Sequence, residues 1–135
     1  MRALFEDYAA RVQPRLNLVE LPQPKATTDL KEKEAALLLK HWPKQGTVIV
    51  CDERGKNLSS RELAGFIGKS MDTRGPDVTF IIGGADGLAD SIVQKADLKL
   101  ALGSLTWPHL LVRVLLAEQI YRVQSILAGH PYHRD

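Results

Sequence analysis

The sequence has little cysteine, no long apolar run and no excess of one charge. Cys51 is the single cysteine among 135 residues, which excludes an internal disulfide and fits a reducing compartment such as the cytoplasm. Arg113, Glu118 and Arg122 interrupt the longest apolar stretch, so we expect no membrane-spanning helix and no membrane partner. The 18 Lys and Arg residues against 16 Asp and Glu leave a formal charge of only +2. General coating of nucleic acid, DNA included, is therefore not expected, and any contact with RNA must be local.

The rest of the composition is typical of one folded domain. Hydrophobic residues make up 44% of the chain, which is enough for a core, and 135 residues leave no room for separate catalytic and binding modules. Glu6 and Asp7 lie where a secretory signal requires an apolar block. We therefore expect residues 1–135 to form a single cytoplasmic domain.

Strand-like and helical segments alternate along the chain. Short apolar runs predict buried strands at 47–51 and 78–82, an alternating segment predicts a strand at 15–21, and a further strand is predicted at 98–102. The predicted helices carry apolar residues at helical spacing, and they cover residues 4–13, 29–41, 59–71, 89–96 and 110–127. This alternation predicts an α/β fold with a mainly parallel sheet and helices on both faces.

Two of these helices begin with a recognisable start signal. Asp29 is followed three residues later by Glu32, and Ser59 is followed three residues later by Glu62. In a capping box, the first side chain accepts from a backbone N–H group and the second reaches back to the N-cap. We expect both pairs to form capping boxes.

Two glycine-bearing loops follow predicted strands. The first is IIGGADG (81–87), and the second is LGSLTWPH (102–109). Ligands in open α/β sheets bind at the carboxyl ends of the strands, so these loops suggest one shared pocket. The first loop lacks the spacing of a dinucleotide fingerprint or a P-loop, and a tight strand-to-helix turn is the alternative. The second loop has no acid or cysteine, which favours backbone hydrogen bonds to a planar heterocycle over hydrolytic chemistry.

The helix at 110–127 is apolar nearly all round. A terminal helix of a small domain is not easily covered by its own chain, so an apolar surface on nearly all sides of it predicts self-association. His109 with Arg113, and Glu118 with Arg122, have the spacing of pairs along one helix face.

The last residues, HPYHRD (130–135), are either an unstructured polar tail or an RNA-binding segment. Tyr132, His133 and Arg134 provide a stacking ring, a hydrogen-bonding ring and a phosphate-pairing group. A metal site built from His109, His130 and His133 is a more distant interpretation, because zinc sites require further ligands at fitting spacing.

Three segments together resemble one enzyme family: GGADGL, SLTWPHLLVRVLLAEQIYR and the terminal HPYHRD. The chain resembles the small bacterial methyltransferases that modify N3 of a pseudouridine in large-subunit (23S) ribosomal RNA. These belong to the SPOUT, or trefoil-knotted, methyltransferases. The resemblance implies a C-terminal knot, S-adenosylmethionine as cofactor, and a homodimer whose active site combines both subunits. The implied partner is 23S rRNA in the large subunit or the assembled ribosome.

The resemblance also implies roles for particular residues. The implied cofactor residues lie in three segments and are Cys51, Gly83, Leu102, Gly103, Ser104, Leu105, Thr106 and Trp107. The residues implied for RNA binding and methyl transfer are Glu118, Arg122, Tyr132, His133 and Arg134. No metal is implied. Of these, we expect Arg122 and Arg134 to position the substrate and stabilise charge, Glu118 to orient Arg122, and His133 to relay a proton.

One feature departs from the family pattern. Its members begin with a further β-strand and a short loop, whereas this chain begins at the helix that follows, so we expect a sheet with one strand fewer. Two other functions stay open at this stage: a non-catalytic RNA- or ribosome-binding homodimer, and a metal-dependent hydrolase that uses the three histidines named above.

Overall fold

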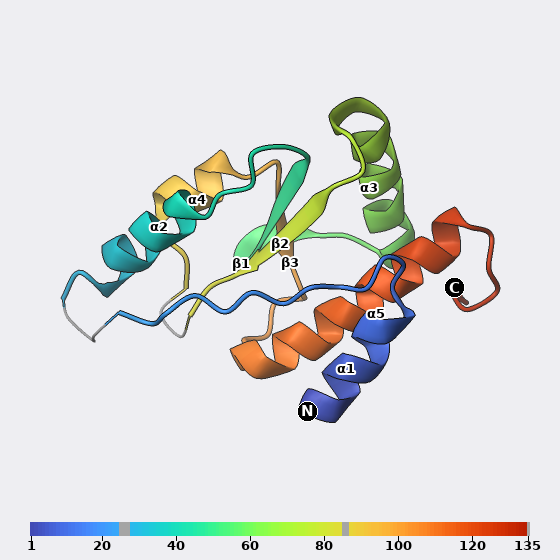
Figure 1. Ribbon diagram of the computed structural model, residues 1–135, viewed down its shortest axis with the longest axis horizontal. Helices are drawn as coiled ribbons and strands as arrows, with labels where there is room; N and C mark the ends of the chain where they lie inside the picture. The colour runs from blue at the N-terminus through green and yellow to red at the C-terminus, as the bar shows by residue number, and fades with distance from the viewer. Residues whose placement is uncertain (25–27, 85–86, 135) are drawn as a thin grey trace.

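The computed structural model describes residues 1–24, 28–84 and 87–134. The helices are α1 (Arg2–Arg11), α2 (Leu30–Lys40), α3 (Ser60–Arg74), α4 (Asp90–Lys95) and α5 (His109–Leu127). The strands are β1 (Thr47–Asn57), β2 (Val78–Ile82) and β3 (Leu98–Ala101). The sheet lies in the middle of the molecule with helices on both of its faces (Figure 1), which confirms the predicted α/β class.

The described part of the chain contains one parallel sheet with the strand order β2-β1-β3. Thr47 of β1 lies beside Val78 of β2, and Ile49 of β1 lies beside Leu98 of β3. All three strands run in the same direction, so their carboxyl ends meet at one edge of the sheet. The predicted strand at 78–82 has the observed bounds, and the other two predictions match β1 and β3 in place and type.

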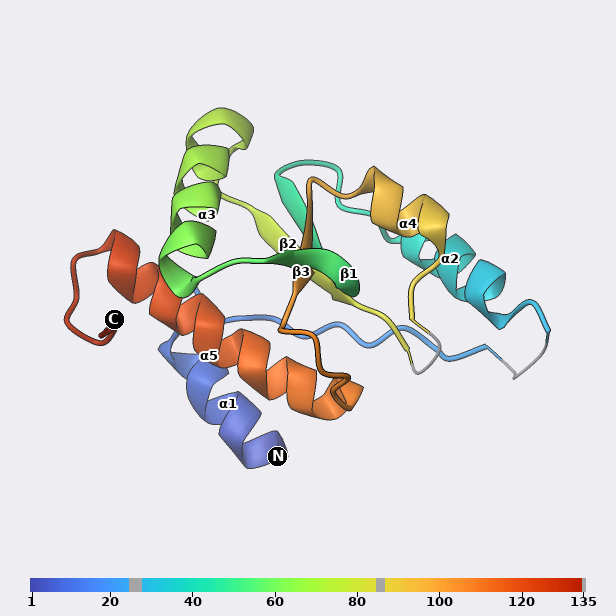
Figure 2. The ribbon, with the colours of Figure 1, turned by 180° about the vertical axis from the view of Figure 1, so that it is seen from behind.

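The central strand β1 is buried on both faces, as its β-branched run predicts. Val48 and Val50 pack toward one face, where α2 and α4 cover them. Ile49 packs toward the opposite face, against residues of α3 and α5. Figure 2 shows the same division from behind, with α2 and α4 together on one side and α3 and α5 on the other.

Helix α1 packs on the outer side of α5 and does not touch the sheet core. Phe5 and Ala9 are buried against Val114 and Ala117 of α5. Polar contacts fix the segment just after α1 to α5. The Gln124 side chain accepts from the backbone N–H of residue 13 at 3.0 Å and donates to its carbonyl at 2.7 Å. Helix α5 is therefore covered by the sheet on one side and by α1 on another.

The predicted helix at 110–127 begins one residue earlier, at His109. Leu110 and Leu127, at its two ends, remain 46% and 49% exposed. Within the described residues, no helix is both long and apolar enough to cross a membrane.

The two predicted capping boxes differ in outcome. The Ser59 hydroxyl accepts from the Glu62 N–H at 3.1 Å, and the Glu62 carboxylate accepts from the Ser59 N–H at 2.9 Å, so this box is confirmed. Asp29 is the N-cap of α2, but its side chain makes no cap hydrogen bond and lies 3.6 Å from Lys33. The prediction for Asp29 was wrong: its backbone, with φ −110° and ψ 30°, lies outside the extended conformation usual for a capping residue, and its carboxylate pairs with Lys33 instead.

The predicted strand at 15–21 was also wrong. This segment is irregular in the structure and pairs with none of the sheet strands. Leu18 and Val19 are 45% and 74% exposed, so the alternation of apolar residues does not correspond to a buried face here. A strand needs a neighbour to accept its backbone hydrogen bonds, and sequence alternation alone does not supply one.

The tail after α5 folds back along the helix and is not an extended polar end (Figure 2). Gly129 has a φ of 72°, the left-handed conformation that commonly ends a helix. The His130 N–H donates to the Ser125 carbonyl at 2.8 Å, and Tyr132 and His133 are half-buried. The interpretation as an unstructured tail is therefore wrong.

The Ser59 capping box gives a direct test of local stability. Replacing Ser59 with Ala removes the acceptor for the Glu62 N–H and should lower the free energy of unfolding by about 1 kcal/mol. Urea unfolding followed by circular dichroism measures this difference. Ser59→Thr keeps the hydroxyl and should lose much less, and equal loss in the two variants would contradict the capping role.

Candidate functional site

A pocket of about 770 Å³ opens at the carboxyl ends of the strands. Its walls come from residues 51–54 of β1, the turn after β2, the loop after β3 and the first turns of α5, with Lys31 added from α2. Binding sites in parallel sheets occur at this edge, and pockets for small ligands have volumes of about 300–1,000 Å³. The two loops predicted to share a pocket therefore do so.

All but one of the predicted cofactor residues line this pocket. They are Cys51, Gly83, Leu102, Gly103, Leu105, Thr106 and Trp107. Ser104 belongs to the same loop but is not among the lining residues. The residues predicted for RNA binding and methyl transfer lie elsewhere.

Two glycines shape the pocket for different reasons. A Cβ atom on Gly83 would lie 2.9 Å from the Leu88 side chain and 3.1 Å from the backbone of Gly87, so the position leaves no room for a side chain. Gly83 does not have a positive φ, whereas Gly103 has a φ of 86° and open space around it. Close packing is therefore the constraint at Gly83, and backbone conformation is the constraint at Gly103.

The loop after β3 is held by one long-range and one local hydrogen bond. The Gly103 N–H donates to the Asn57 side chain at 3.1 Å, and the Trp107 indole N–H donates to the Leu102 carbonyl at 2.8 Å. Trp107 thereby bridges back over the start of its own loop while its ring lines the pocket. These bonds fix the loop before any ligand arrives, which lowers the entropy lost on binding.

One polar wall of the pocket was missed by the sequence analysis. Both Cys51 and Lys56 pair with Leu100, so residues 52–55 bulge out of the ladder toward the pocket. Arg54 donates to Asp52 from its Nε and Nη2 atoms, each at 2.9 Å, and this contact lowers the pKa of Asp52. These residues directly follow a predicted strand, so the rule that drew attention to the glycine loops also applied to them.

The Cys51 thiol faces this pocket in its neutral form. Burial raises the pKa of Cys51 to about 12. A thiol with so high a pKa carries almost no thiolate at neutral pH and is a poor nucleophile. Cys51 therefore contributes an apolar surface to the pocket.

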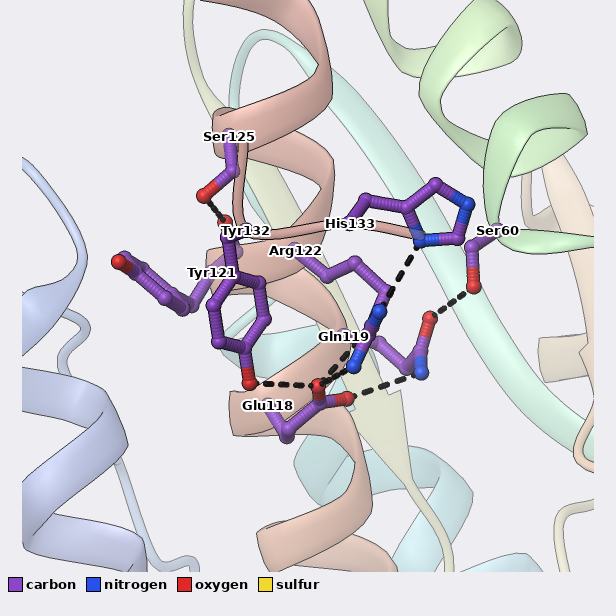
Figure 3. Close-up of polar contacts among 8 residues, drawn as sticks. All are labelled: Ser60, Glu118, Gln119, Tyr121, Arg122, Ser125, Tyr132 and His133. Carbon is purple, nitrogen blue, oxygen red and sulfur yellow. Dashed lines mark hydrogen bonds and ion pairs between the residues drawn. The ribbon is translucent and has the colours of Figure 1, made fainter. Parts of the chain in front are cut away.

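A second polar cluster begins at the middle of α5 and is centred on Glu118 (Figure 3). One Glu118 oxygen accepts from Arg122 Nε at 2.9 Å and from the Tyr132 hydroxyl at 3.0 Å. The other oxygen accepts from the Gln119 side chain at 2.9 Å. The predicted pair of Glu118 and Arg122 is thus confirmed, whereas Arg113 donates to Glu20 at 2.9 Å.

Arg122 joins the helix to the tail. Its Nη1 donates to His133 Nδ1 at 3.0 Å, and its Cζ lies 4.8 Å from the centre of the Tyr132 ring. A guanidinium can only donate, so Nδ1 is the acceptor and the remaining imidazole proton is on Nε2. Glu118 raises the pKa of Arg122, which keeps the guanidinium charged. Arg134 follows in the chain and is exposed.

Gln119 and Ser60 support this cluster and were not predicted. Ser60 donates to the Gln119 carbonyl oxygen at 2.7 Å, and this bond fixes the amide so that its nitrogen faces Glu118. Figure 3 shows the chain of contacts from Ser60 through Gln119 and Glu118 to the tail. Sequence alone gave no signal for it, because the two partners are 59 residues apart.

The pocket and the Glu118 cluster are separated along one rigid helix. Val112 lines the pocket, and Glu118 and Arg122 follow it six and ten residues later, about 9 Å and about 15 Å further along the helix axis. The predicted cofactor residues and the predicted substrate residues therefore lie in different parts of one chain, and a second hollow, lined by Leu102 and Gly103 as well as by Ser60 and Gln119, lies between them.

The three histidines considered as metal ligands do not form a site. Among the described residues, no three His, Cys, Asp or Glu side chains lie close enough together to hold a metal ion. His109 lines the pocket, whereas His133 contacts Arg122 in the other cluster.

Known proteins with similar sequences are methyltransferases. The profile of a family described as "Predicted SPOUT methyltransferase" matches residues 1–133. The protein named ribosomal RNA large subunit methyltransferase H of Rhodospirillum centenum is 50% identical over 135 residues, covering 98% of this chain and 89% of the relative. The proteins of the same name from Paramagnetospirillum magneticum and Rhodospirillum rubrum are 47% and 44% identical, over 97% and 99% of this chain and 88% and 90% of the relatives.

The tail cluster predicts an unusual tyrosine titration. Desolvation, followed by the hydrogen bond to Glu118, raises the pKa of Tyr132 to about 12. The folded state then binds this proton more tightly than the unfolded state, so docking of the tail should weaken as the pH rises from about 10 to about 12. Spectrophotometric titration should show a late ionisation that Tyr132→Phe removes. If Tyr132→Phe instead removes an ionisation centred near pH 10, the docked geometry is contradicted.

Proposed function

Because the chain belongs to the SPOUT methyltransferase family, as its motifs predicted, we propose that it methylates N3 of a pseudouridine in 23S ribosomal RNA with S-adenosylmethionine as the methyl donor. The observation that carries this proposal is the pocket at the sheet edge, which gathers the glycine turn and the loop at 102–109. The relatives named for methylation of large-subunit ribosomal RNA support the substrate class. The reaction would take place in the cytoplasm, where ribosomes are.

The residues of the pocket fit the proposed cofactor. Leu100, Leu102 and Val112 provide apolar surface of the kind that an adenine ring needs. Lys31 and Glu53 provide charges of both signs, which suits an amino-acid moiety with a carboxylate and an ammonium group. The neutral Cys51 thiol adds surface without a competing nucleophile.

The bound cofactor would supply a methyl group on a sulfonium, and the protein would align it with the attacking nitrogen. Such an in-line displacement depends on positioning, and the N3 proton must leave. In this proposal Arg122 and Arg134 position the nucleotide and stabilise charge, and Glu118 orients Arg122 through two hydrogen bonds. His133 relays the proton, with its Nε2 directed away from the bond that Nδ1 makes to Arg122.

The separation of the two sites supports a homodimer with shared active sites. Within one chain, Arg122 lies about 15 Å further along α5 than Val112 of the pocket, and the Tyr132 ring is docked beside Arg122. A two-fold partner can bring the tail of one chain to the pocket of the other. The exposed leucines at both ends of α5 are suited to such an interface.

Cofactor binding can be tested without the RNA. Gly83→Val should abolish binding of S-adenosylhomocysteine in isothermal titration calorimetry, because the new side chain collides with Leu88. Gly65→Val is the matched control, since a Cβ there meets nothing within 4 Å. Wild-type binding should be unaffected by a chelator. If Gly83→Val binds as well as the control, the pocket is wrongly assigned.

Methyl transfer itself is the test of the proposed function. Purified ribosomes that lack the modification should accept labelled methyl from the cofactor under single-turnover conditions. Deleting residues 130–135 should leave cofactor affinity nearly intact and lower the transfer rate by orders of magnitude. A truncated chain that transfers at the wild-type rate would exclude the tail from catalysis, and a wild-type chain that binds ribosomes without transfer would favour a non-catalytic binding protein.

Shared active sites can be tested by mixing two inactive variants. In a heterodimer of Gly83→Val and the tail deletion, one site has both defects and the other has a normal pocket and a normal tail. Random exchange makes half of the dimers mixed, so about a quarter of the wild-type activity should return. No recovery after confirmed subunit exchange would show that each site lies within one chain.

A further inference from the structure

All three tyrosines of the chain gather at the end of α5 that carries the tail. Arg11 Cζ lies 5.4 Å from the ring centre of Tyr8 and 5.8 Å from that of Tyr121. Tyr121 meets Tyr132 edge-on with ring centres 4.6 Å apart, and Arg122 lies over the Tyr132 ring. These five side chains form one continuous arrangement, which we call the tyrosine-arginine stack. Figure 3 shows its part on α5 and the tail.

Arg11 is not the only group that holds α1 in place. Phe5 and Ala9 already bury the inner face of α1 against α5. Two hydrogen bonds between the Gln124 side chain and the backbone of residue 13 fix the chain just beyond the end of α1. With these contacts in place, Arg11 can serve a role in addition to the docking of its helix.

The guanidinium of Arg11 is held in orientation and still accessible. Its side chain is 46% exposed, and its contact with a carboxylate is a 3.2 Å pair with Asp7. Such surface pairs contribute about 0–1 kcal/mol, so a stronger anion can replace Asp7. A guanidinium stacked on aromatic rings has lost part of its rotamer freedom, and its planar donors match a phosphate in a two-pronged contact.

We propose that Arg11 binds a backbone phosphate of the RNA, next to the nucleotide engaged by Tyr132 and Arg122. In this arrangement Tyr8 and Tyr121 are positioning residues that orient the Arg11 guanidinium. Aromatic rings and guanidinium groups are the groups that bind unstacked RNA. The inference rests on the proposed function, in which the tail engages the RNA, and it extends the substrate surface from α5 to α1.

Three variants separate this role from a structural one. Arg11→Ala should weaken ribosome binding about tenfold and reduce the slope of log affinity against log salt by about 0.7, the value for one phosphate contact on a single strand. Arg11→Lys should recover part of the affinity and the full slope, since lysine keeps the charge without the planar fork. Arg74→Ala is the matched control, because Arg74 is also half-exposed and paired with one carboxylate, Asp97.

Asp7→Asn should change ribosome affinity in the opposite direction. It removes the anion that competes with phosphate and should strengthen ribosome binding about two- to threefold, which corresponds to the free energy that a surface ion pair contributes. A merely structural ion pair would give a loss or no change. The Asp7→Asn variant still tests the inference if Arg11→Ala fails to fold.

The measurements are ribosome binding at several salt concentrations, single-turnover methyl transfer, and calorimetric cofactor affinity. Cofactor affinity should be the same in all variants. Unchanged binding and salt slope in Arg11→Ala, or no gain in Asp7→Asn, would overturn this inference while wild-type transfer remains intact. Absence of transfer by the wild-type protein would instead overturn the proposed function, so the two failures are distinguishable.

Discussion

The burial of β1 on both faces is the constraint on which the rest of the structure depends. Val48 and Val50 require cover on one face of the sheet, and Ile49 requires it on the other. The connections between parallel strands must therefore place helices on opposite faces, and each returns the chain to start the next strand in the same direction. The carboxyl ends of all three strands consequently meet at one edge, and the pocket forms where the loops leave it.

Helix α5 links this sheet to the remaining polar chemistry. Its first turns close the pocket, its buried side packs against the sheet and α1, and its second half carries Glu118 and Arg122. A helix has a fixed rise for each residue, so it holds the two sites apart as a rigid spacer. An apolar ligand pocket and a separate charged, aromatic cluster suit methyl transfer to RNA, because the cofactor and the nucleic acid need different surroundings.

The candidate site was predictable in part, because its residues follow local rules to different degrees. Gly83 and the loop at 102–109 come directly after recognisable strands, so the sheet-edge rule located them. Asp52 and Arg54 obey the same rule, but they belong to a bulge that only the pairing of β1 with β3 defines. Gln119 carried no signal, because its role depends on a serine far away in the sequence.

The sequence by itself determined the features whose causes are local. The β-branched run at 47–51 is apolar enough to be central in a sheet, and Ser59 finds its capping partner three residues away. Its motifs also determined the family. Tertiary structure alone decided that 15–21 pairs with no strand, that the Asp29 side chain makes no cap hydrogen bond to α2, and that the tail docks on α5. Each of those outcomes depends on which groups the fold brings within hydrogen-bonding distance, and short sequence patterns do not contain that information.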